Sequence, residues 1–486
     1  MDPLSFPLTP LILDRAAGVI VASAVGDALG AAYEFGGPVD PATVEMGEGA
    51  LTSRHAGAWT DDTDMGMGIL EVLAEGIDIH TPEGQTAVAE RFLAWWFDEP
   101  DDVGNQTARA LYGARGAADL VRSARDAQDA RPHSCGNGSL MRTGPVALGY
   151  LDDPEALLHA ARAMSELTHP HPDAVAVCQL WSLAIAEAVR SGDSPMACVQ
   201  RATSRVPSIG TQSTSQLLLD AEEASPQQLR DNGGAVNALR AAWWAISSTA
   251  HLTGPAHLEA ALCAAISLGG DTDTVAAIAG ALLGASYGAS AIPYRWRERL
   301  WGFPFYITEG DLARLAVRAV RHGASDSAGW PTVLDLSDYY RDVWDAPLTQ
   351  VTSPIDSQLT VGSVMALPHR RDDAVVSLCR IGVTQRGGDH YEAWLMDGPE
   401  NLHPTFVLED VADTVERWLM RGTVFLHCVR AESRTPSAYA AWLIRHRGYS
   451  FDDALAATYE LLPSAKPHPA LLAALARVSP VTGKFS

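Results

Sequence analysis

Cysteine is scarce in this chain, with only six among 486 residues. The six are scattered and include no Cys-x-x-Cys pair: Cys135, Cys178, Cys198, Cys263, Cys379 and Cys428. Scattered single cysteines argue against a disulfide framework and against a structural zinc site. The sequence therefore indicates a reducing compartment, and we expect the protein in the cytoplasm.

A membrane-spanning run and a basic N-terminal segment are also missing. The apolar run Gly18–Ala32 contains Asp27 and is shorter than the roughly 20 residues that span a bilayer. The chain opens with Met1-Asp2-Pro3, without the positive charge of a secretory signal. We expect no secretory signal and no membrane partner.

Positive charge is in short supply as well. The chain has 35 Lys and Arg against 59 Asp and Glu, a net charge of −24. Residues 351–486 are nearly balanced, with 13 basic and 15 acidic residues, so the excess lies before residue 351. Such a charge repels a phosphate backbone and argues against a general nucleic-acid binder. It suits metal loading, but a solvated acidic surface explains most of it equally well.

Apolar residues at three- and four-residue spacing dominate residues 10 to about 325, whereas sustained β-branched alternation is absent. The spacing predicts helices at Ala108–Arg125, Pro154–Leu167, Asp173–Arg190, Asn237–Ser248 and Thr274–Tyr287. After about residue 325 the pattern changes to short strands alternating with helices. We predict strands at Ala374–Leu378, Ala393–Met396 and Thr423–Leu426, and helices at Val407–Met420 and Pro436–Arg447. The predicted organisation is an all-α domain (1–330), a linker (331–350) and a small α/β domain (351–486).

Two short acidic turns each precede a helical stretch. They are Thr60-Asp61-Asp62-Thr63-Asp64 and Asp271-Thr272-Asp273-Thr274. Thr and Asp are common N-cap residues, and acids in a first turn offset the helix dipole, so either turn alone is explained by capping. Together they gather more carboxylates than caps need, and carboxylate and hydroxyl oxygens are ligands that Mg²⁺ and Mn²⁺ prefer. The pair therefore predicts a metal site.

Other segments of the helical region carry weaker signals. Gly26–Gly30 is followed by Glu34, Gly136–Ser139 forms a Gly-rich turn able to face phosphate, and His169 precedes a helix. Each is ordinary by itself, as a plain turn, a solvated acid or a satisfied histidine.

In this order, and with the blocks Trp-Thr-Asp-Asp-Thr and Gly-Gly-Asp-Thr-Asp-Thr, these segments resemble the ADP-ribosylglycohydrolase family over residues 12 to about 300. The resemblance implies an all-α fold with two Mg²⁺ or Mn²⁺ ions. Its implied metal ligands are Thr60, Asp61, Asp62, Asp271, Asp273 and Thr274. It also implies a catalytic group of Glu34, Asp61, Asp62 and Asp273. The ADP-ribose would be held by Gly136, Asn137, Gly138, Ser139 and His169.

The chemistry suits these residue types. Cleavage at the anomeric carbon of a ribose builds oxocarbenium character, and two ions can grip ribose hydroxyls and lower the pKa of a water. A carboxylate such as Glu34 can assist proton transfer. The expected substrate is an ADP-ribosylated protein or small molecule. An arginine, a serine, a nucleic-acid end and a small conjugate remain open as acceptors.

A second site is predicted near the C-terminus. The stretch from Val424 to Pro436 reads as an apolar strand, the loop His-Cys-x5-Arg-Thr and a helix. Such a loop aims backbone N–H groups and a helix N-terminus at one anion and favours a thiolate at Cys428. Arg434 can grip phosphate with its planar fork. A lone cysteine ending a core strand would be structural, but the full pattern favours a nucleophile.

This pattern resembles cysteine phosphatases of the dual-specificity and tyrosine type, over about residues 351–470. The resemblance implies Cys428 as nucleophile, Arg434 as phosphate clamp and Thr435 or Ser433 as a hydroxyl aiding thiolate departure. Asp397 lies where such enzymes place the general acid, although it can equally be a turn residue. The family commonly has Gly at the position of Ala431, so we expect the loop to demand a conformation that Ala resists.

The leading hypothesis is a metal-dependent hydrolase that releases ADP-ribose, joined to a phosphatase-like module acting on a phosphate ester. Two alternatives stay open at this point. One is a protein that binds ADP-ribose without cleaving it. The other is a protein whose main activity is phosphate-ester hydrolysis by the C-terminal domain, with the helical domain as a scaffold.

Overall fold

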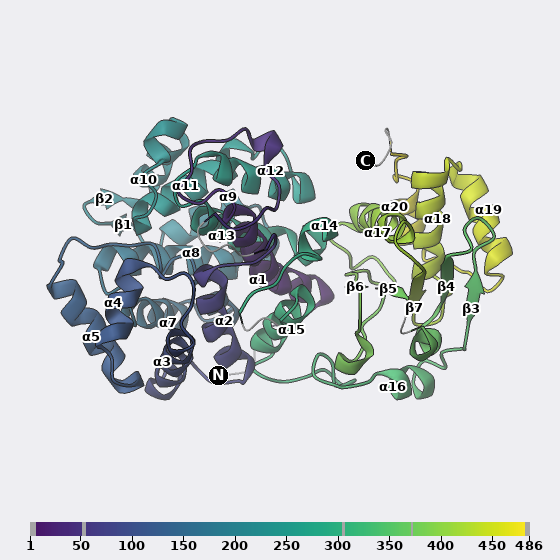
Figure 1. Cartoon of the computed structure of the whole chain (residues 1–486), viewed down its shortest axis with the longest axis horizontal. Coiled ribbons are helices and arrows are strands. Elements are labelled where there is room, and N and C mark those ends of the chain that lie inside the picture. The colour runs from purple at the N-terminus through teal and green to yellow at the C-terminus, as the bar shows by residue number, and fades with distance from the viewer. Residues whose placement is uncertain (1–5, 51–54, 304–306, 371–372, 482–486) are drawn as a thin grey trace. The chain divides into compact units, whose positions relative to one another are not determined.

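The chain folds into two compact units. The computed structural model describes residues 6–50, 55–303, 307–370 and 373–481. The larger unit comprises residues 1–292 and 299–324, and the smaller unit comprises residues 293–298 and 325–486. Figure 1 shows helices throughout the larger unit and a sheet with helices in the smaller one. The all-α and α/β prediction for the two regions is thereby confirmed.

Helices make up nearly all of the regular structure of the larger unit. Those in its first half are α1 (Pro10–Gly30), α2 (Asp61–Ala74), α3 (Pro82–Phe97), α4 (Asn105–Gly113), α5 (Ala117–Asp129), α6 (Gly144–Leu148) and α7 (Pro154–Glu166). Those that follow are α8 (Pro172–Ser191), α9 (Pro195–Thr203), α10 (Thr214–Glu222), α11 (Ala235–Ser248), α12 (Gly254–Ser267), α13 (Thr272–Tyr287) and α15 (Glu309–Val320). The short strands β1 (Ser208–Ile209) and β2 (Gln212–Ser213) form an antiparallel pair.

Helices α1 and α13 lie in backbone contact at the centre of this unit. A Cβ added at Gly26 would lie 2.3 Å from the carbonyl oxygen of Ala276, and one at Gly30 would lie 2.4 Å from the Cα of Asp273. Any larger residue at these positions would force the helices apart. The glycines of α1 therefore bring Asp27 next to the first turn of α13.

One long helix predicted from the sequence is wrong in its extent. The stretch 108–125 is divided between α4 and α5 by residues 114–116, and Gly116 has an extended backbone with φ of 173°. The spacing of apolar residues continues across this break, which is why periodicity alone missed it. The helix predicted at Pro154–Leu167 is confirmed as α7.

The smaller unit contains a five-stranded sheet in the order β3-β4-β7-β5-β6. Its strands are β3 (Gln350–Thr352), β4 (Leu359–Ser363), β5 (Ala374–Ser377), β6 (His390–Glu392) and β7 (Val424–Cys428). Only the edge strand β3 pairs in the antiparallel sense. The strand predicted at Ala393–Met396 is wrong, because the strand at that edge ends at Glu392. The segment predicted as a linker contains a short helix, α16 (Ser337–Asp342).

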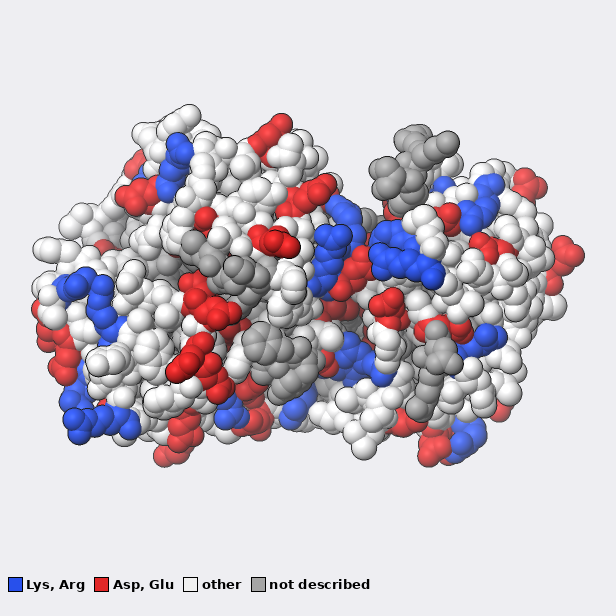
Figure 2. Space-filling model, viewed as in Figure 1, with Lys and Arg blue, Asp and Glu red and all other residues white. Residues whose placement is uncertain are grey.

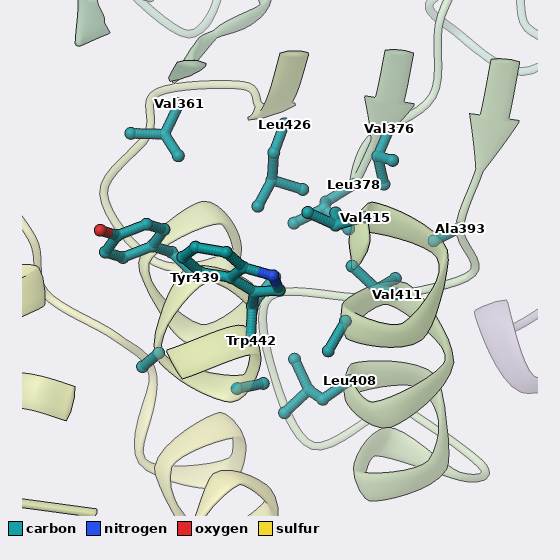
Figure 3. Close-up of a cluster of buried hydrophobic side chains, with 14 of the residues drawn as sticks. Val361, Val376, Leu378, Ala393, Leu408, Val411, Val415, Leu426, Tyr439 and Trp442 are labelled. Carbon is teal, nitrogen blue, oxygen red and sulfur yellow. The ribbon is translucent and has the colours of Figure 1, made fainter. Parts of the chain in front are cut away.

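Helices cover the sheet of the smaller unit and build its core. They are α14 (Tyr294–Arg297), α17 (Pro404–Leu419), α18 (Arg434–Arg447), α19 (Phe451–Leu461) and α20 (Pro469–Leu475). Figure 3 shows Leu408, Val411 and Val415 of α17 and Trp442 of α18 packed beneath the strands. Burial of such side chains is worth about 1.5–3 kcal/mol each. This core fixes the central strand β7 and the helix that follows it.

Two surface and burial properties bear on function. On the face shown in Figure 2, basic and acidic side chains form separate small patches, and the described residues make no broad basic surface there.

One helix, α8, is long and apolar enough to cross a membrane, but 72% of its apolar window is buried inside the protein. Burial of this kind is expected of a core helix.

Candidate functional site

The two acidic turns meet in the larger unit. Helix α2 begins at Asp61 and α13 begins at Thr272. The Thr274 hydroxyl donates to Asp62 Oδ2 at 3.2 Å, and Thr60 Oγ1 lies 3.4 Å from Asp273 Oδ2. Both turns therefore contribute oxygen atoms to one buried cluster. The predicted ligands Thr60, Asp62, Asp273 and Thr274 are brought together.

Capping does not explain the acids of these turns. Thr60 and Asp271 occupy the N-cap positions of α2 and α13, yet neither side chain makes the capping hydrogen bond. Instead Asp27 of α1 accepts hydrogen bonds from the backbone N–H groups of Thr60 and Thr63, both at 3.0 Å. Asp27 also accepts the Thr60 hydroxyl at 2.9 Å, which leaves the lone pairs of that oxygen available to a cation. The capping interpretation is therefore wrong for Thr60 and Asp271.

Asp27 lies within the Gly26–Gly30 segment, and the sequence alone indicates no role for it. It is fully buried, and burial raises its pKa to about 6, against the hydrogen bonds from Thr60 and Thr63. The signal that could have found it is a charged residue inside the otherwise apolar helix α1. It holds the turn that begins at Thr60 from behind, through hydrogen bonds to Thr60 and Thr63.

The three acids of the first turn differ in their surroundings. Asp64 accepts hydrogen bonds from the indole N–H groups of Trp59 at 2.8 Å and Trp95 at 3.0 Å. Asp61 accepts from the backbone N–H of Gly104 at 3.3 Å, and Asp62 faces Thr274. Asp64 is therefore held by two indole groups and has a structural role. It was not among the predicted metal ligands.

Two buried carboxylate oxygens in the cluster have no hydrogen-bond donor among the described residues. These are Oδ1 of Asp62 and Oδ1 of Asp273. Burial and neighbouring carboxylates hold the pKa values of Asp61, Asp62 and Asp273 well above their usual range. Orphaned oxygens and crowded acids are unfavourable unless a cation compensates them. The residues present thus fit a divalent metal ion.

Glu34 and an acid that the sequence analysis missed complete the cluster. One carboxylate oxygen each of Glu34, Asp102 and Asp273 lie within 4.8 Å of one another. Burial, followed by Asp102, Asp271 and Asp61, raises the pKa of Glu34 to about 9. Asp102 belongs to an acidic loop, Asp98-Glu99-Pro100-Asp101-Asp102, whose density of acids was the available signal. Glu34 is therefore able to hold a proton at neutral pH.

Asp271 and the Gly-rich turn are also neighbours. Asn137 donates from Nδ2 to Asp271 Oδ2 at 2.8 Å. However, the backbone N–H of Gly136 bonds Gln106 Oε1 at 3.0 Å and that of Asn137 bonds the Gly233 carbonyl at 3.2 Å. Only part of the turn is therefore left to meet a diphosphate.

His169 lies against this turn. A Cβ at Gly138 would be 3.0 Å from its Cε1 and one at Gly136 would be 3.3 Å from its Nε2, so the two glycines make room for the ring. Burial and the nearby Arg142 hold the pKa of His169 well below its usual range, so the ring is neutral. Thr168 bonds Nδ1 at 2.7 Å and accepts from Arg142 at 2.6 Å, which favours a proton on Nε2 toward the turn.

The second site occupies the smaller unit, at the carboxyl end of the central strand. Cys428 ends β7, where it pairs with Ser363 of β4, and the loop from Val429 to Ser433 leads into α18. Ser433 occupies the N-cap position of α18 without capping it. None of the backbone N–H groups from Arg430 to Arg434 has an acceptor among the described residues. Unsatisfied N–H groups around a helix N-terminus make an anion-binding nest.

Arg434 is oriented by the ends of neighbouring strands. Its Nη1 donates to the carbonyl of Leu378 at 2.6 Å and to that of Leu395 at 3.4 Å. Its buried Nε has no acceptor among the described residues. One edge of the guanidinium is thus fixed by the protein while a donor remains for an anion.

Ala431 of this loop and Asp397 beside it have unusual surroundings. Ala431 is buried and has φ of 58°, the left-handed region that favours glycine. The sequence prediction that Ala would have to adopt such a conformation is confirmed. Asp397 lies beside the loop, as its predicted role requires, but its Oδ1 accepts the Ser433 hydroxyl at 2.5 Å. The Ser433 hydroxyl and the Asp397 carboxylate are therefore hydrogen-bonded to each other.

A hydrogen-bond chain holds the side chain of His427, the residue before Cys428 in β7, and the sequence pattern indicates no role for it. His390 Nε2 and His427 Nε2 lie 2.8 and 2.7 Å from the hydroxyl of Ser377. Burial lowers the pKa of His427 to about 3, so its ring is neutral. The chain therefore fixes the ring next to Cys428 by hydrogen bonds rather than by charge.

Comparison with known proteins identifies the larger unit. The ADP-ribosylglycohydrolase family model matches residues 8–328. ADP-ribosylarginine hydrolase Tri1 of Pseudomonas putida (strain GB-1) is 30% identical over 309 residues, covering 60% of this chain and 76% of the relative. A solved structure described as an ADP-ribosylglycohydrolase-related protein complex is 28% identical, with a TM-score of 0.50. It covers 64% of this chain and 99% of its own.

The smaller unit has a more distant counterpart. The crystal structure of human DUSP28 is 22% identical, with a TM-score of 0.25, and covers 28% of this chain and 96% of its own. The family model spans most of the chain, and this chain belongs to the ADP-ribosylglycohydrolase family.

Proposed function

We propose that the larger unit is a metal-dependent hydrolase that releases ADP-ribose from an ADP-ribosylated arginine of a protein. The observation that carries the proposal is the convergence of α2 and α13 on buried carboxylates, two of whose oxygens have no donor among the described residues. A bound divalent cation would compensate these crowded carboxylates and supply a partner for the two orphaned oxygens. Because the full set of predicted ligands is retained, the proposal favours hydrolysis over binding alone.

The residues that would hold two Mg²⁺ or Mn²⁺ ions are Thr60, Asp61, Asp62, Asp271, Asp273 and Thr274. When bound, such ions grip ribose hydroxyls and lower the pKa of a water molecule. Asp27 keeps the Thr60 hydroxyl oriented, with its hydrogen directed at Asp27 and its lone pairs at the cluster. Asn137 holds the Asp271 carboxylate through the hydrogen bond at Oδ2.

Proton transfer is assigned to the Glu34 and Asp102 pair. Glu34, whose carboxyl lies within the same cluster as Asp102 and Asp273, would assist proton transfer to or from the reacting groups. Asp102, within the same 4.8 Å cluster, can then accept a proton from water. His169 and the Gly138–Ser139 part of the turn would bind the diphosphate.

Arginine as acceptor is supported by the Tri1 relative, whose name states that linkage. It is also supported by charge, because a guanidinium carried to this cluster meets Asp102 and the acidic loop that contains it. A planar cation is the leaving group that such carboxylates stabilise best.

The test compares wild type, Asp273→Asn and the matched control Asp129→Asn, which changes an exposed acid of α5. ADP-ribose release is measured on arginine-linked and serine-linked ADP-ribosyl proteins, with Mg²⁺, with Mn²⁺ and with a chelator. We expect metal-dependent release from the arginine linkage, its loss in Asp273→Asn and its retention in Asp129→Asn. If the wild type bound ADP-ribose but released none from either linkage, the larger unit would be a protein that binds ADP-ribose without cleaving it.

A second function is proposed for the smaller unit: hydrolysis of a phosphate monoester by Cys428. The unsatisfied N–H groups from Arg430 to Arg434 and the open Nε of Arg434 support it. Attack of the Cys428 thiolate on phosphorus would form an S–P bond and break the ester bond, with Asp397 protonating the departing oxygen. Water would then cleave the S–P bond, which releases inorganic phosphate and regenerates the thiolate. Loss of turnover in Cys428→Ser with inorganic phosphate still bound would support this role, whereas unchanged turnover would refute it.

A further inference from the structure

A short segment of the family-matched region folds as part of the smaller unit. The chain leaves the larger unit after Ile292 and returns to it at Arg299, and residues 293–298, which include α14, belong to the smaller unit. The family model covers residues 8–328, so α14 lies inside the matched region. The two units are therefore interleaved along the chain and do not simply follow one another.

Tyr294 of α14 is a core residue of the smaller unit. It is 4% exposed, and its ring stacks on Tyr391 of β6 with the centroids 3.8 Å apart. The ring also meets Trp418 of α17 edge-on at 5.8 Å, and its hydroxyl donates to the His390 carbonyl at 2.9 Å. Stacked and edge-to-face aromatic pairs stabilise a fold beyond the burial of their area. Loss of α14 would therefore uncover one side of this aromatic cluster.

The same helix compensates a buried acid. Asp410 of α17 is buried, which raises its pKa, and its carboxylate accepts the backbone N–H of Tyr294 at 3.0 Å and the Tyr391 hydroxyl at 2.9 Å. Arg297 of α14 is 2% exposed and places Nη2 3.9 Å from Asp410 Oδ2 and 2.9 Å from the Tyr391 hydroxyl. Without α14, Asp410 would lose the N–H bond and this ion pair inside the protein, which is costly.

The chain on both sides of α14 is anchored in the larger unit. Before the helix, the hydroxyl and the backbone N–H of Ser290 bond to Asp14 of α1, at 2.6 and 2.9 Å. After the helix, Trp301 exchanges backbone hydrogen bonds with Gly57 and Trp59, at 3.1 and 3.0 Å. Both anchors lie within four residues of α14. Folding of the larger unit therefore restrains α14 and lowers the entropy that its packing on the smaller unit costs.

We propose that α14 is an obligate docking element, supplied by the helical part of the chain, without which the smaller unit is not stable. Residues 325–486 by themselves would keep the binding surface for α14, made of β6 and α17, but not its occupant. The smaller unit is then a dependent part of this chain and not a separable module. This inference goes beyond both proposed activities and depends on neither of them.

The test cuts the full-length protein once. A protease recognition sequence is inserted between Ala324 and Ser325, where the chain passes for the last time from the larger to the smaller unit. After cleavage, α14 belongs to the 1–324 fragment, and its association with the 325–486 fragment is measured by sedimentation velocity over a concentration series. The variants are Tyr294→Ala, Tyr294→Phe and Arg297→Ala, and Arg295→Ala changes an exposed residue of the same helix as the matched control.

We expect the cut wild-type and Arg295→Ala proteins to sediment as one particle. Tyr294→Ala should weaken the association about 100-fold or more, the range for truncating a large buried aromatic side chain, and Arg297→Ala should weaken it as well. Tyr294→Phe should retain most of the association, because it keeps the stacked ring. Equal association in wild type and Tyr294→Ala would overturn the inference. Wild-type fragments that separate while 325–486 keeps its circular dichroism would overturn it too.

Hydrogen exchange in the uncut protein distinguishes a local effect from general misfolding. In Tyr294→Ala, the amides of β6 and α17 should exchange faster, while those of α1 keep the wild-type rate. Faster exchange throughout both units would overturn the assignment of α14 to the smaller unit.

Discussion

The two sites use the same structural device, a helix N-terminus, with opposite charge. At α2 and α13 the first turns carry acids, Asp61 and Asp62 on one and Asp273 on the other, and the orphaned atoms are carboxylate oxygens. At α18 the first turn carries no acid, and the orphaned atoms are N–H groups. A helix N-terminus is positive in both cases. Several carboxylates at a helix N-terminus make the local electrostatic potential negative, which suits a cation. N–H groups without acceptors leave the potential positive, which suits an anion.

The largest expected effect separates the two sites completely. Asp273→Asn should reduce ADP-ribose release at least about 1,000-fold, because it removes a charge that a metal ion needs. In the metal-free protein the same change should raise the midpoint of thermal unfolding, since Asp273 lies among like charges from Asp271, Asp62 and Glu34.

Release assays and thermal unfolding in a chelator check both effects, and inorganic phosphate binding by the smaller unit should stay unchanged. A metal-free Asp273→Asn protein that unfolds at a lower temperature would show that the carboxylates stabilise the fold. In that case the carboxylates at α2 and α13 would not be held against their mutual repulsion, and the contrast with the anion site at α18 would not hold.

Asp27→Asn should have the next largest effect. The amide keeps the shape but weakens the bonds that Asp27 accepts from Thr60 and Thr63. Outer-shell changes of this kind lower metal affinity about 10- to 100-fold. Mn²⁺ titration measures the loss, and excess Mn²⁺ should restore most of the release rate. No rescue at saturating Mn²⁺ would place Asp27 in the reaction itself.

Sequence reasoning predicted the acidic cluster where its residues follow one another along the chain. The turns at Thr60 and Asp271 carry their acids in a few consecutive residues, so the signal was local. Asp27 was missed because its partners Thr60 and Thr63 lie 33 and 36 residues further along the chain, and only the fold brings α1 to the start of α2. Asp102 was missed for the same reason, since only the fold brings its loop to Glu34.

The fold shows the same limit. Periodicity predicted the helices and the change of class near residue 325, but it joined α4 to α5 across Gly116. A break inside a continuous apolar face is decided by what packs on either side of it. In the smaller unit, by contrast, the conformation of Ala431 could be anticipated, because the phosphatases that this loop resembles commonly have glycine at that position.

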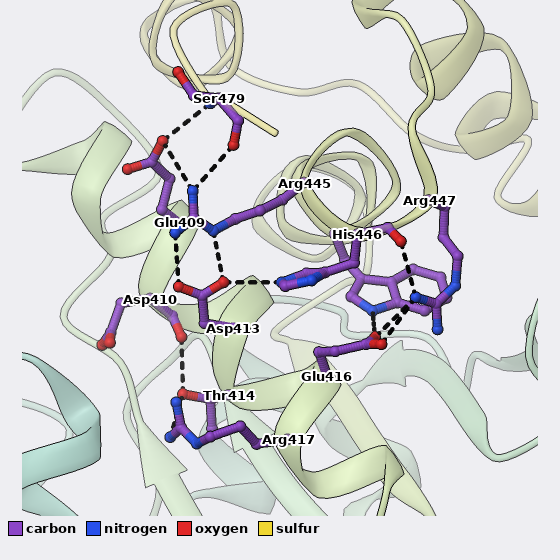
Figure 4. A network of polar contacts seen from close by, with 11 residues as sticks. Glu409, Asp410, Asp413, Thr414, Glu416, Arg417, Arg445, His446, Arg447 and Ser479 are labelled. Carbon is purple, nitrogen blue, oxygen red and sulfur yellow. Dashed lines mark hydrogen bonds and ion pairs between the residues drawn. The ribbon is translucent and has the colours of Figure 1, made fainter. Parts of the chain in front are cut away.

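A smaller effect concerns a charged network away from both sites. In Figure 4, Asp413 of α17 accepts hydrogen bonds from Arg445 and is bonded to His446 of α18, at 2.6 to 2.8 Å. Burial opposes ionisation, yet these bonds hold the pKa of Asp413 below its usual value. Asp413→Asn should therefore lower the free energy of unfolding of the smaller unit by about 2 kcal/mol at neutral pH.

The sign of the pH dependence follows from the lowered pKa of Asp413. The stabilisation is fully present above about pH 4, the unfolded value, and is lost as the pH falls through the folded one. The difference between wild type and Asp413→Asn should therefore shrink below about pH 4, as measured by denaturant unfolding. Both activities should survive at neutral pH, and a loss of phosphate binding would show that the α17–α18 network also shapes the anion site.

The smallest change tests whether the anion site is fully formed. Ala431 is buried at φ of 58°, a conformation that costs a residue with a Cβ about 1–2 kcal/mol relative to glycine. Ala431→Gly should raise the free energy of unfolding of the smaller unit by about 1 kcal/mol or less, because glycine also gains freedom in the unfolded chain. If the strain also holds the N–H groups away from their best geometry, phosphate affinity should rise with stability, by a few-fold. A stabilised variant with unchanged affinity would show that the strained loop already has its binding geometry, so that the smaller unit, like the acidic cluster, is preorganised for an ion at the expense of its own stability.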